Sequence, residues 1–260
     1  MNERAASASE PVVEVRGLVT RFGDKTVHDG IDLHVARGEV MAIVGASGSG
    51  KSVLMRELIL LHRPTAGHIR LLSQEVDGLS EGQALALRRR FGVLFQSGAL
   101  FGEMTVAENV SVPLREHTNL SETLIRELAA VKIALAGLPP DAGTLFPSQL
   151  SGGMKKRAAL ARAIALDPTL LFLDEPGSGL DPISVNALDD LVLQLKNALG
   201  LTVIMVTHDM ESLWRVADRV VLLGAGRILA SGTMEALHAS DIPAVRAFFR
   251  GRQTRKGSQL

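Results

Sequence analysis

Residues 45–52 read GASGSGKS, and they follow the apolar run EVMAIV at residues 39–44. The spacing Gly-x4-Gly-Lys-Ser is typical of a phosphate-binding loop, because glycines let successive backbone N–H groups turn toward one anion. Apolar residues recur at helical spacing from Lys51 onward, so the loop joins a strand to a helix whose positive N-terminal end also favours phosphate. The stretch therefore predicts a nucleotide site in an α/β fold, with these binding residues: Gly45, Ser47, Gly48, Ser49, Gly50, Lys51 and Ser52.

A second apolar run, residues 170–173, ends in the carboxylates Asp174 and Glu175. We expect this strand and the glycine loop to meet at one edge of a parallel sheet, where such folds bind their ligands. Lys51 would contact the β- and γ-phosphates, while Ser52 and Asp174 would hold Mg²⁺. Glu175 would orient or deprotonate the attacking water, a role worth about 10²–10⁴ in rate. We therefore predict that the chain binds and hydrolyses a nucleotide with Mg²⁺, and that Lys51 and Glu175 are catalytic residues.

The run LSGGM at residues 150–154 lies between these two halves of a nucleotide site. Ser151, Gly152 and Gly153 precede a predicted helix, so a hydroxyl and backbone N–H groups at its positive N-terminal end could bind a phosphate. An ordinary helix cap would use the same residues. In this order and spacing, the three motifs resemble those of the ATPase subunit of an ABC transporter. In that family the signature motif of one copy closes over the ATP held by another. The resemblance implies a homodimer in which Ser151, Gly152 and Gly153 bind the partner's ATP.

Four further residues take their roles from this resemblance. His208 corresponds to the switch histidine that senses the γ-phosphate, which adds it to the catalytic set. Gln96 corresponds to the Q-loop glutamine, which binds ATP and reaches Mg²⁺. Asp181 lies in the D-loop, which meets the ATP of the partner chain, and Phe22 takes the place of the aromatic residue that stacks on adenine. Without the resemblance, His208 would be an ordinary residue at a strand end. Gln96 and Asp181 would be turn residues, and Phe22 would be a core residue.

The composition limits the classes of function. Apolar residues make up 46% of the 260, which supports a sizeable core, and the 28 basic residues balance the 28 acidic ones. We therefore expect no nucleic acid as a partner. The absence of cysteine excludes disulfides and thiolate metal sites. The N-terminus lacks the apolar stretch of a signal peptide, and no apolar run reaches the roughly 18–20 residues that span a bilayer, so we expect a soluble chain that reaches a membrane through partners.

The fold class predicted from these features is α/β. The resemblance implies a P-loop NTPase with a RecA-like parallel-sheet core, an N-terminal antiparallel β subdomain and an inserted helical subdomain. We expect a flexible tail at residues 1–11 and an ABC ATPase domain at 12–238, whose helical subdomain covers about 97–166. The remaining residues, 239–260, would form a C-terminal tail.

Local patterns give finer expectations. Residues 67–76 and 91–96 each read as one strand, and residues 183–198 read as a helix. Pro113 is expected to break the helical subdomain. Trp214 is expected in the core or at an interface.

The subgroup is indicated by three segments, FQSGALF at residues 95–101, PLREHT at 113–118 and the stretch 150–168. Together they resemble the ATPase of the maintenance-of-lipid-asymmetry (Mla, toluene-tolerance) system. That family moves phospholipid between the inner membrane and a periplasmic carrier. Its complexes imply two ATPase chains, two membrane permease chains, MCE-domain proteins and often a small STAS-domain protein. The chain would then lie on the cytoplasmic face of the inner membrane, held there by the permease subunits.

Two segments leave alternatives open. The apolar stretch at residues 97–106 follows Gln96 and could receive a cytoplasmic helix of a permease, or Leu100 and Phe101 could pack within the helical subdomain. The C-terminal tail carries an apolar pair at residues 248–249, and it could dock on a second copy or be disordered.

Two rival functions remain. One is an ABC ATPase that serves an importer of another substrate, such as an amino acid or a metal. The other is a soluble ABC-type ATPase that acts on nucleic acid or ribosomes. The single cassette, the lack of a long insertion and the zero net charge argue against the second rival.

Overall fold

The computed structural model describes residues 10–250, and the predicted tail at 1–11 therefore lies outside it except for its last two residues. The strands are β1 (Val13–Phe22), β2 (Lys25–Val35), β3 (Val40–Val44), β4 (Ala66–Leu71), β5 (Gln74–Glu75), β6 (Phe91–Leu94), β7 (Leu170–Asp174), β8 (Thr202–Val206), β9 (Arg219–Gly224) and β10 (Arg227–Gly232). The helices are α1 (Lys51–Leu58), α2 (Glu81–Arg88), α3 (Val106–His117), α4 (Glu122–Leu135), α5 (Gly152–Ala163), α6 (Pro182–Leu199), α7 (Met210–Val216), α8 (Met234–His238) and α9 (Pro243–Arg250).

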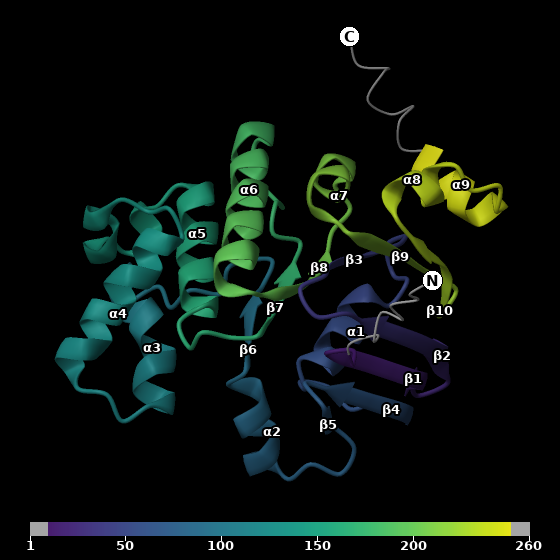
Figure 1. The fold of residues 1–260 in the computed structure, drawn as a ribbon, viewed down its shortest axis with the longest axis horizontal. Helices are drawn as coiled ribbons and strands as arrows, with labels where there is room; N and C mark the ends of the chain where they lie inside the picture. The colour runs from purple at the N-terminus through teal and green to yellow at the C-terminus, as the bar shows by residue number, and fades with distance from the viewer. Residues whose placement is uncertain (1–9, 251–260) are drawn as a thin grey trace, which may run out of the picture.

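The strands form two sheets, which confirms the predicted fold class (Figure 1). A smaller antiparallel sheet has the order β2-β1-β4-β5, and a larger sheet has the order β10-β9-β3-β8-β7-β6. In the larger sheet β3 runs parallel to β8 and β9, and β7 runs parallel to β6 and β8. Such strands are almost wholly apolar because both faces of the sheet are covered.

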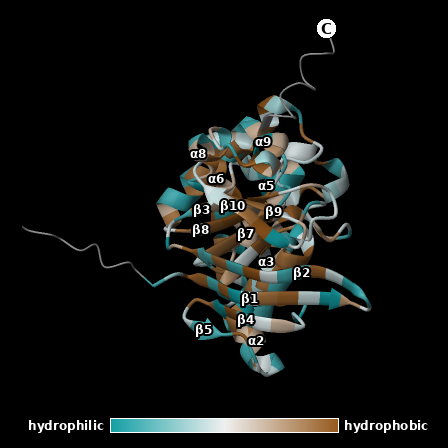
Figure 2. Cartoon of the chain, turned by 90° about the vertical axis from the view of Figure 1, so that its right-hand side faces the viewer, coloured by the Kyte–Doolittle hydropathy of each residue, from teal (hydrophilic) through white to brown (hydrophobic). Residues whose placement is uncertain are grey.

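Alternate residues of the parallel strands supply two different cores. On β3, Met41 and Ile43 pack with α1 and the smaller sheet, whereas Val40, Ala42 and Val44 pack with the helices on the other face. Figure 2 shows apolar residues concentrated on the strands in the middle of the molecule. Helix α1, which follows the glycine loop, is thus held between the two sheets.

The prediction of one strand over residues 67–76 is wrong, since the chain forms a hairpin there. Leu72 and Ser73 have φ values of 50° and 66°, and β4 and β5 pair on either side of them. This left-handed turn normally needs Gly or Asn, so the sequence gives little sign of it. The strand predicted over residues 91–96 ends earlier, at Leu94.

A third core lies in the helical region between β6 and β7. Pro113 does not break it, because it lies inside α3. Thr105 and Glu108 form a capping box at the start of α3, and Val110 and Leu114 are buried on either side of the proline. This packing outweighs the backbone hydrogen bond that a proline removes. Within residues 10–250, none of the helices combines the length and the apolar composition that crossing a bilayer requires.

The C-terminal segment folds onto its own chain as far as the structure describes it. Val245 and Phe249 of α9 are fully buried in the same core as Leu222 of β9. Residues 243–250 therefore form a helix packed on the core of their own chain, contact with a second copy stays a prediction, and residues 251–260 lie outside the description. Trp214 is 47% exposed, so its predicted place in the core is wrong and only the interface alternative stays a prediction.

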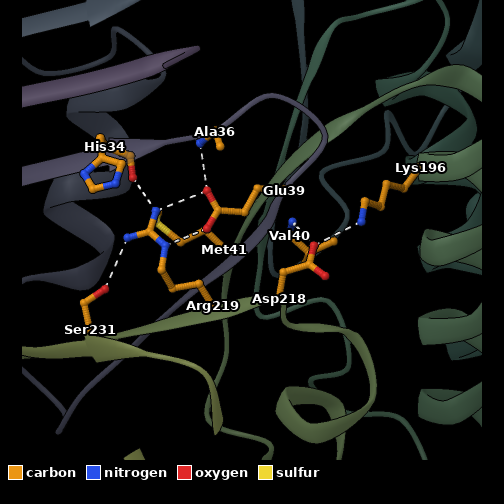
Figure 3. Close-up of polar contacts among 9 residues, drawn as sticks. All are labelled: His34, Ala36, Glu39, Val40, Met41, Lys196, Asp218, Arg219 and Ser231. Carbon is orange, nitrogen blue, oxygen red and sulfur yellow. Dashed lines mark hydrogen bonds and ion pairs between the residues drawn. The ribbon is translucent and has the colours of Figure 1, made fainter. Parts of the chain in front are cut away.

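An ionic cluster joins the two sheets at the amino-terminal edge of β3 and β9 (Figure 3). Arg219 donates to the carboxylate of Glu39 at 2.6 and 3.1 Å and to the carbonyl of His34 at 2.5 Å. Asp218 accepts the N–H of Val40 at 2.8 Å. These contacts fix the smaller sheet at the edge opposite the glycine loop.

Asp189 is a buried acid between α6 and α7. It is 4% exposed, and its Oδ2 atom has no hydrogen-bond partner among the described residues. Burial raises the pKa of Asp189 to about 6, a rise that Asp209 and Asp190 reinforce and that Ser212 and Arg215 oppose.

We predict that Asp189→Asn will stabilise the protein at neutral pH. A raised native pKa means that protonation favours the folded state, so the wild type loses stability as the pH rises from about 4 through about 6. Asn stays neutral, so its advantage should grow over this window to about 3 kcal/mol. Urea unfolding of both proteins between pH 4 and pH 8 measures this, and a constant difference would contradict it.

Candidate functional site

The glycine loop and several other predicted site residues lie at the carboxyl edge of the parallel sheet. The glycine loop follows β3, Gln96 follows β6, Asp174 ends β7 and His208 follows β8. Ile43 and Asp174 both pair with Val206, so three strands end at the same level. The expectation that the loop and the carboxylates share one edge is confirmed.

The glycine loop is shaped by contacts that exclude larger residues. A Cβ on Gly45 would lie 2.2 Å from the Leu223 carbonyl oxygen, and one on Gly50, whose φ is 100°, would lie 2.6 Å from His28. Lys51 Nζ donates to the carbonyls of Gly45 and Ala46, at 3.0 Å each. The loop therefore forms a turn with a cation at its centre, which suits an anionic ligand.

Phe22 lies beside this loop. Its ring is 49% exposed and stacks on His62 with centroids 4.9 Å apart and an angle of 20° between the planes. A cavity of about 400 Å³ is lined by Phe22, Lys25, Val27 and residues 48–53. One face of the ring is thus backed by His62, and a planar base could stack beside a phosphate group on the loop.

The two carboxylates differ in their surroundings. Glu175 Oε2 lies 2.8 Å from His208 Nδ1, and both line a cavity of about 280 Å³. Burial, followed by the neighbouring charge of Glu175, raises the pKa of Asp174, while Arg56, Lys156 and Lys51 oppose the rise. Burial disfavours the charged form of this carboxylate, and a bound cation would stabilise that form. The oxygen donors of Asp174, Ser52 and Gln96 suit Mg²⁺, which prefers hard ligands.

Ser151 and Asp181 both cap helices of their own chain. Ser151 Oγ accepts the N–H of Met154 at 3.3 Å, and Asp181 accepts the N–H and O–H of Ser184 at 3.0 and 2.6 Å. These hydrogen bonds lower the pKa of Asp181. Gly152 lies against Leu180, since an added Cβ would be 3.2 Å from its side chain. Their action on a second copy stays a prediction, as does that of Gly153.

Sequence reasoning missed Lys156 of α5. It is 6% exposed, and its Nζ donates to the carbonyls of Gln96 (2.6 Å) and Glu175 (3.3 Å) and to Ser178 Oγ (3.3 Å). The sequence does contain a signal for this burial. Ala159 and Leu160 lie three and four residues after Lys156, so the three side chains share one face of the helix. A lysine on that apolar face needs buried partners.

A buried polar group behind the glycine loop was also missed. Thr20, His28 and Glu57 are fully buried. His28 Nε2 lies 3.1 Å from the Gly50 carbonyl, and Nδ1 lies 3.1 Å from Thr20 Oγ1 and 3.2 Å from Glu57 Oε2. Because a carbonyl only accepts, Nε2 must carry a proton. Thr20 Oγ1 also donates to Glu57 Oε1 at 2.5 Å, so the three side chains form one buried network. This group fixes the loop from behind.

A family model described as ABC transporter matches residues 28–178. The chain belongs to the ABC transporter family. It is an ATP-binding protein of that family and an ATPase, as the resemblance in the sequence implies.

Two curated relatives are similar over most of this ABC ATPase. The "intermembrane phospholipid transport system ATP-binding protein MlaF" of Haemophilus influenzae is 42% identical and covers 94% of this chain and 92% of its own. The "probable ribonucleotide transport ATP-binding protein mkl" of Mycobacterium tuberculosis is 40% identical and covers 96% of this chain but 70% of its own.

Two solved structures share the fold of this ABC ATPase. The ATP-binding cassette MJ0796, in a dimeric post-hydrolysis state bound to ADP and Pi, has a TM-score of 0.78 and 28% identity and covers 85% of this chain and 98% of its own. The cassette cbiO1 from Clostridium perfringens, part of the cbiONQ complex, has a TM-score of 0.81 and 28% identity and covers 96% of this chain and 100% of its own. ABC cassettes therefore dimerise and bind nucleotide in relatives with this fold.

We predict that Glu57 and His28 are strongly coupled. Glu57→Leu leaves the buried His28 without its carboxylate and should lower the free energy of unfolding by about 3 kcal/mol. His28→Leu should cost a similar amount, but the double variant should lose less than the sum, because neither partner remains unpaired. Urea unfolding of the four proteins measures the coupling, and additive losses would contradict it.

Proposed function

We propose that this chain is the ATP-hydrolysing subunit of an ABC complex that moves phospholipid between the inner membrane and a periplasmic carrier. The observation that carries the proposal is the likeness to MlaF, which extends over more than nine tenths of both chains. The likeness to mkl leaves nearly a third of that protein unmatched. The proposed complex contains two copies of this chain, two permease subunits and an MCE-domain protein, to which members of that family often add a small STAS-domain protein.

In the proposed mechanism a first group of residues contacts the phosphates, Mg²⁺ or the attacking water. Lys51 binds the β- and γ-phosphates together with the N–H groups of the glycine loop. Ser52, Gln96 and Asp174 would hold Mg²⁺, which when bound neutralises charge on the phosphates. Glu175 orients the attacking water.

The remaining proposed roles concern the end of the triphosphate and the adenine. His208, held by its contact with Glu175, senses the γ-phosphate. Phe22 stacks on adenine. Each site is closed by the partner copy, through Ser151, Gly152, Gly153 and Asp181, which all lie at or near the surface of this chain.

A groove beside Gln96 is the proposed docking place of the permease. It has a volume of about 460 Å³ and is lined by residues of β6, α3, α5 and the loop at 95–101. Leu100 packs between two cores of its own chain, which is the packing alternative. Phe101 is 51% exposed and is therefore accessible to the proposed permease helix. Arg162 holds the loop through the carbonyls of Gly98 and Ala99, at 2.8 and 2.7 Å. An apolar residue on a fixed loop suits a helix of a membrane partner. The chain would then lie on the cytoplasmic face of the inner membrane.

We predict that Glu175→Gln will stop hydrolysis without loss of ATP binding. The amide cannot accept the proton of water, so kcat should fall at least about 100-fold while the closed ATP-bound dimer accumulates. ATPase assays and size-exclusion chromatography with ATP measure both effects. Lys51→Ala is the matched comparison, because it removes a phosphate contact and should weaken ATP binding about tenfold or more. A Glu175→Gln protein that dimerises no more persistently than the wild type would refute this role.

The substrate is tested by affinity purification of the full chain from detergent-solubilised membranes, followed by mass spectrometry. We expect a polytopic permease, an MCE-domain protein and phospholipid to co-elute. A permease of another class would retain the ATPase and reject the lipid substrate. Elution with ribosomes or without any membrane protein would reject the transport proposal.

A further inference from the structure

Glu175 has a backbone conformation that its side chain disfavours. Its φ is 47°, in the left-handed region that residues with a Cβ seldom occupy. Such a conformation persists where surrounding contacts determine it, and it is often found at functional sites. The conformation turns the chain directly after β7 and places the carboxylate 2.8 Å from His208.

Both backbone polar groups of Glu175 are anchored. Its N–H donates to the carbonyl of Val206 at 2.8 Å, which ties it to the neighbouring strand β8. Its carbonyl accepts from the N–H of Ser178 at 3.1 Å and from Lys156 Nζ of α5 at 3.3 Å. These three contacts hold the peptide units on either side of the Glu175 Cα, so they fix the direction of its side chain, and Lys156 is the one that comes from another element of the ATP site.

The Lys156 ammonium is satisfied by three acceptors from two loops. It has three N–H donors, and the structure gives it three partners: the carbonyls of Gln96 and Glu175 and the hydroxyl of Ser178. The Gln96 contact is the shortest and sets the position of the ammonium. Lys156 therefore joins the loop after β6 to the loop after β7, and it joins both to the helix that Ser151 caps.

We infer that Lys156 is a positioning residue for ATP hydrolysis, which holds the Glu175 backbone in its left-handed conformation and fixes it relative to Gln96 and the signature helix. The inference rests on the proposed role of Glu175 as the residue that orients the attacking water. Lys156 contacts backbone carbonyls and a hydroxyl, so its removal deletes no side chain that the proposed ATP site uses and disturbs the orientation of Glu175 alone. Its loss should therefore slow hydrolysis without weakening ATP binding.

Besides its hydrogen bonds, Lys156 carries a positive charge close to the carboxylates of Asp174 and Glu175. Burial lowers its pKa, while the charges of Asp174 and Glu175 oppose that change. Hydrogen bonding and charge are separated by two variants. Lys156→Met keeps the length of the chain and removes the donors, whereas Lys156→Gln removes the charge and keeps two N–H donors.

The test measures kcat and the dissociation constant of a fluorescent ATP analogue for the full-length chain. We expect Lys156→Met to lower kcat at least tenfold while the dissociation constant stays within threefold of the wild type. Lys156→Gln should recover part of the lost kcat. The matched control is Lys132→Met, because Lys132 is equally buried in the helical region and pairs with Asp167 instead of the site loops. Its kcat should stay within twofold of the wild type.

A second measurement separates positioning from damage to α5. In a Glu175→Gln background, adding Lys156→Met should leave the ATP-dependent dimer intact, since neither the glycine loop nor the signature changes. Loss of that dimer, or of ATP binding, would make Lys156 a structural residue and overturn the inference. A Lys156→Met or Lys156→Gln protein with wild-type kcat would also overturn it. If Glu175→Gln itself hydrolyses ATP normally, the proposed function of Glu175 fails instead.

Discussion

The whole site depends on one constraint, which is that a parallel sheet covered on both faces exposes its strands only at their ends. The strands β3, β7 and β8 end level with one another, as the pairing of Ile43 and Asp174 with Val206 shows. Polar residues placed just after these strands must therefore meet, however far apart they lie in the sequence. The ionic cluster of Arg219 and Glu39 holds the opposite edge, so the smaller sheet and α1 stay fixed beside the glycine loop.

The loops at this edge are held through their backbone carbonyls. His28 fixes the carbonyl of Gly50, Lys156 fixes those of Gln96 and Glu175, and Arg162 fixes the loop that follows Gln96. A contact to a carbonyl sets the path of the chain and leaves the side chain to meet a ligand. These contacts give a structural role to the buried Lys156 and His28, which hold the loops from behind, whereas Lys51 is the cation proposed to contact the phosphates.

The sequence predicts best those features that depend on residue type at fixed spacing. The glycine loop, the carboxylates after an apolar run and the buried strands follow from such patterns, and the structure has each at the expected place. The hairpin at Leu72 and Ser73 escapes prediction because ordinary side chains adopt left-handed angles that only the surrounding sheet can impose. His28 escapes because alternation along β2 changes phase at Gly30: residues 31, 33 and 35 are buried, and so is residue 28. Pro113 misleads because packing on either side of it holds α3 together.

Helix α5 gives the proposed docking groove a physical connection to the ATP site. Arg162 holds the loop that carries Phe101, and Lys156 holds the backbone of Glu175. The two residues are six positions apart on one helix, a rise of about 9 Å, so a rigid-body movement of α5 displaces both loops together. A permease helix pressing on the loop at 97–101 would thus act on the orientation of Glu175 without touching the nucleotide. On this proposal a permease and ATP would be coupled through the position of one helix, α5.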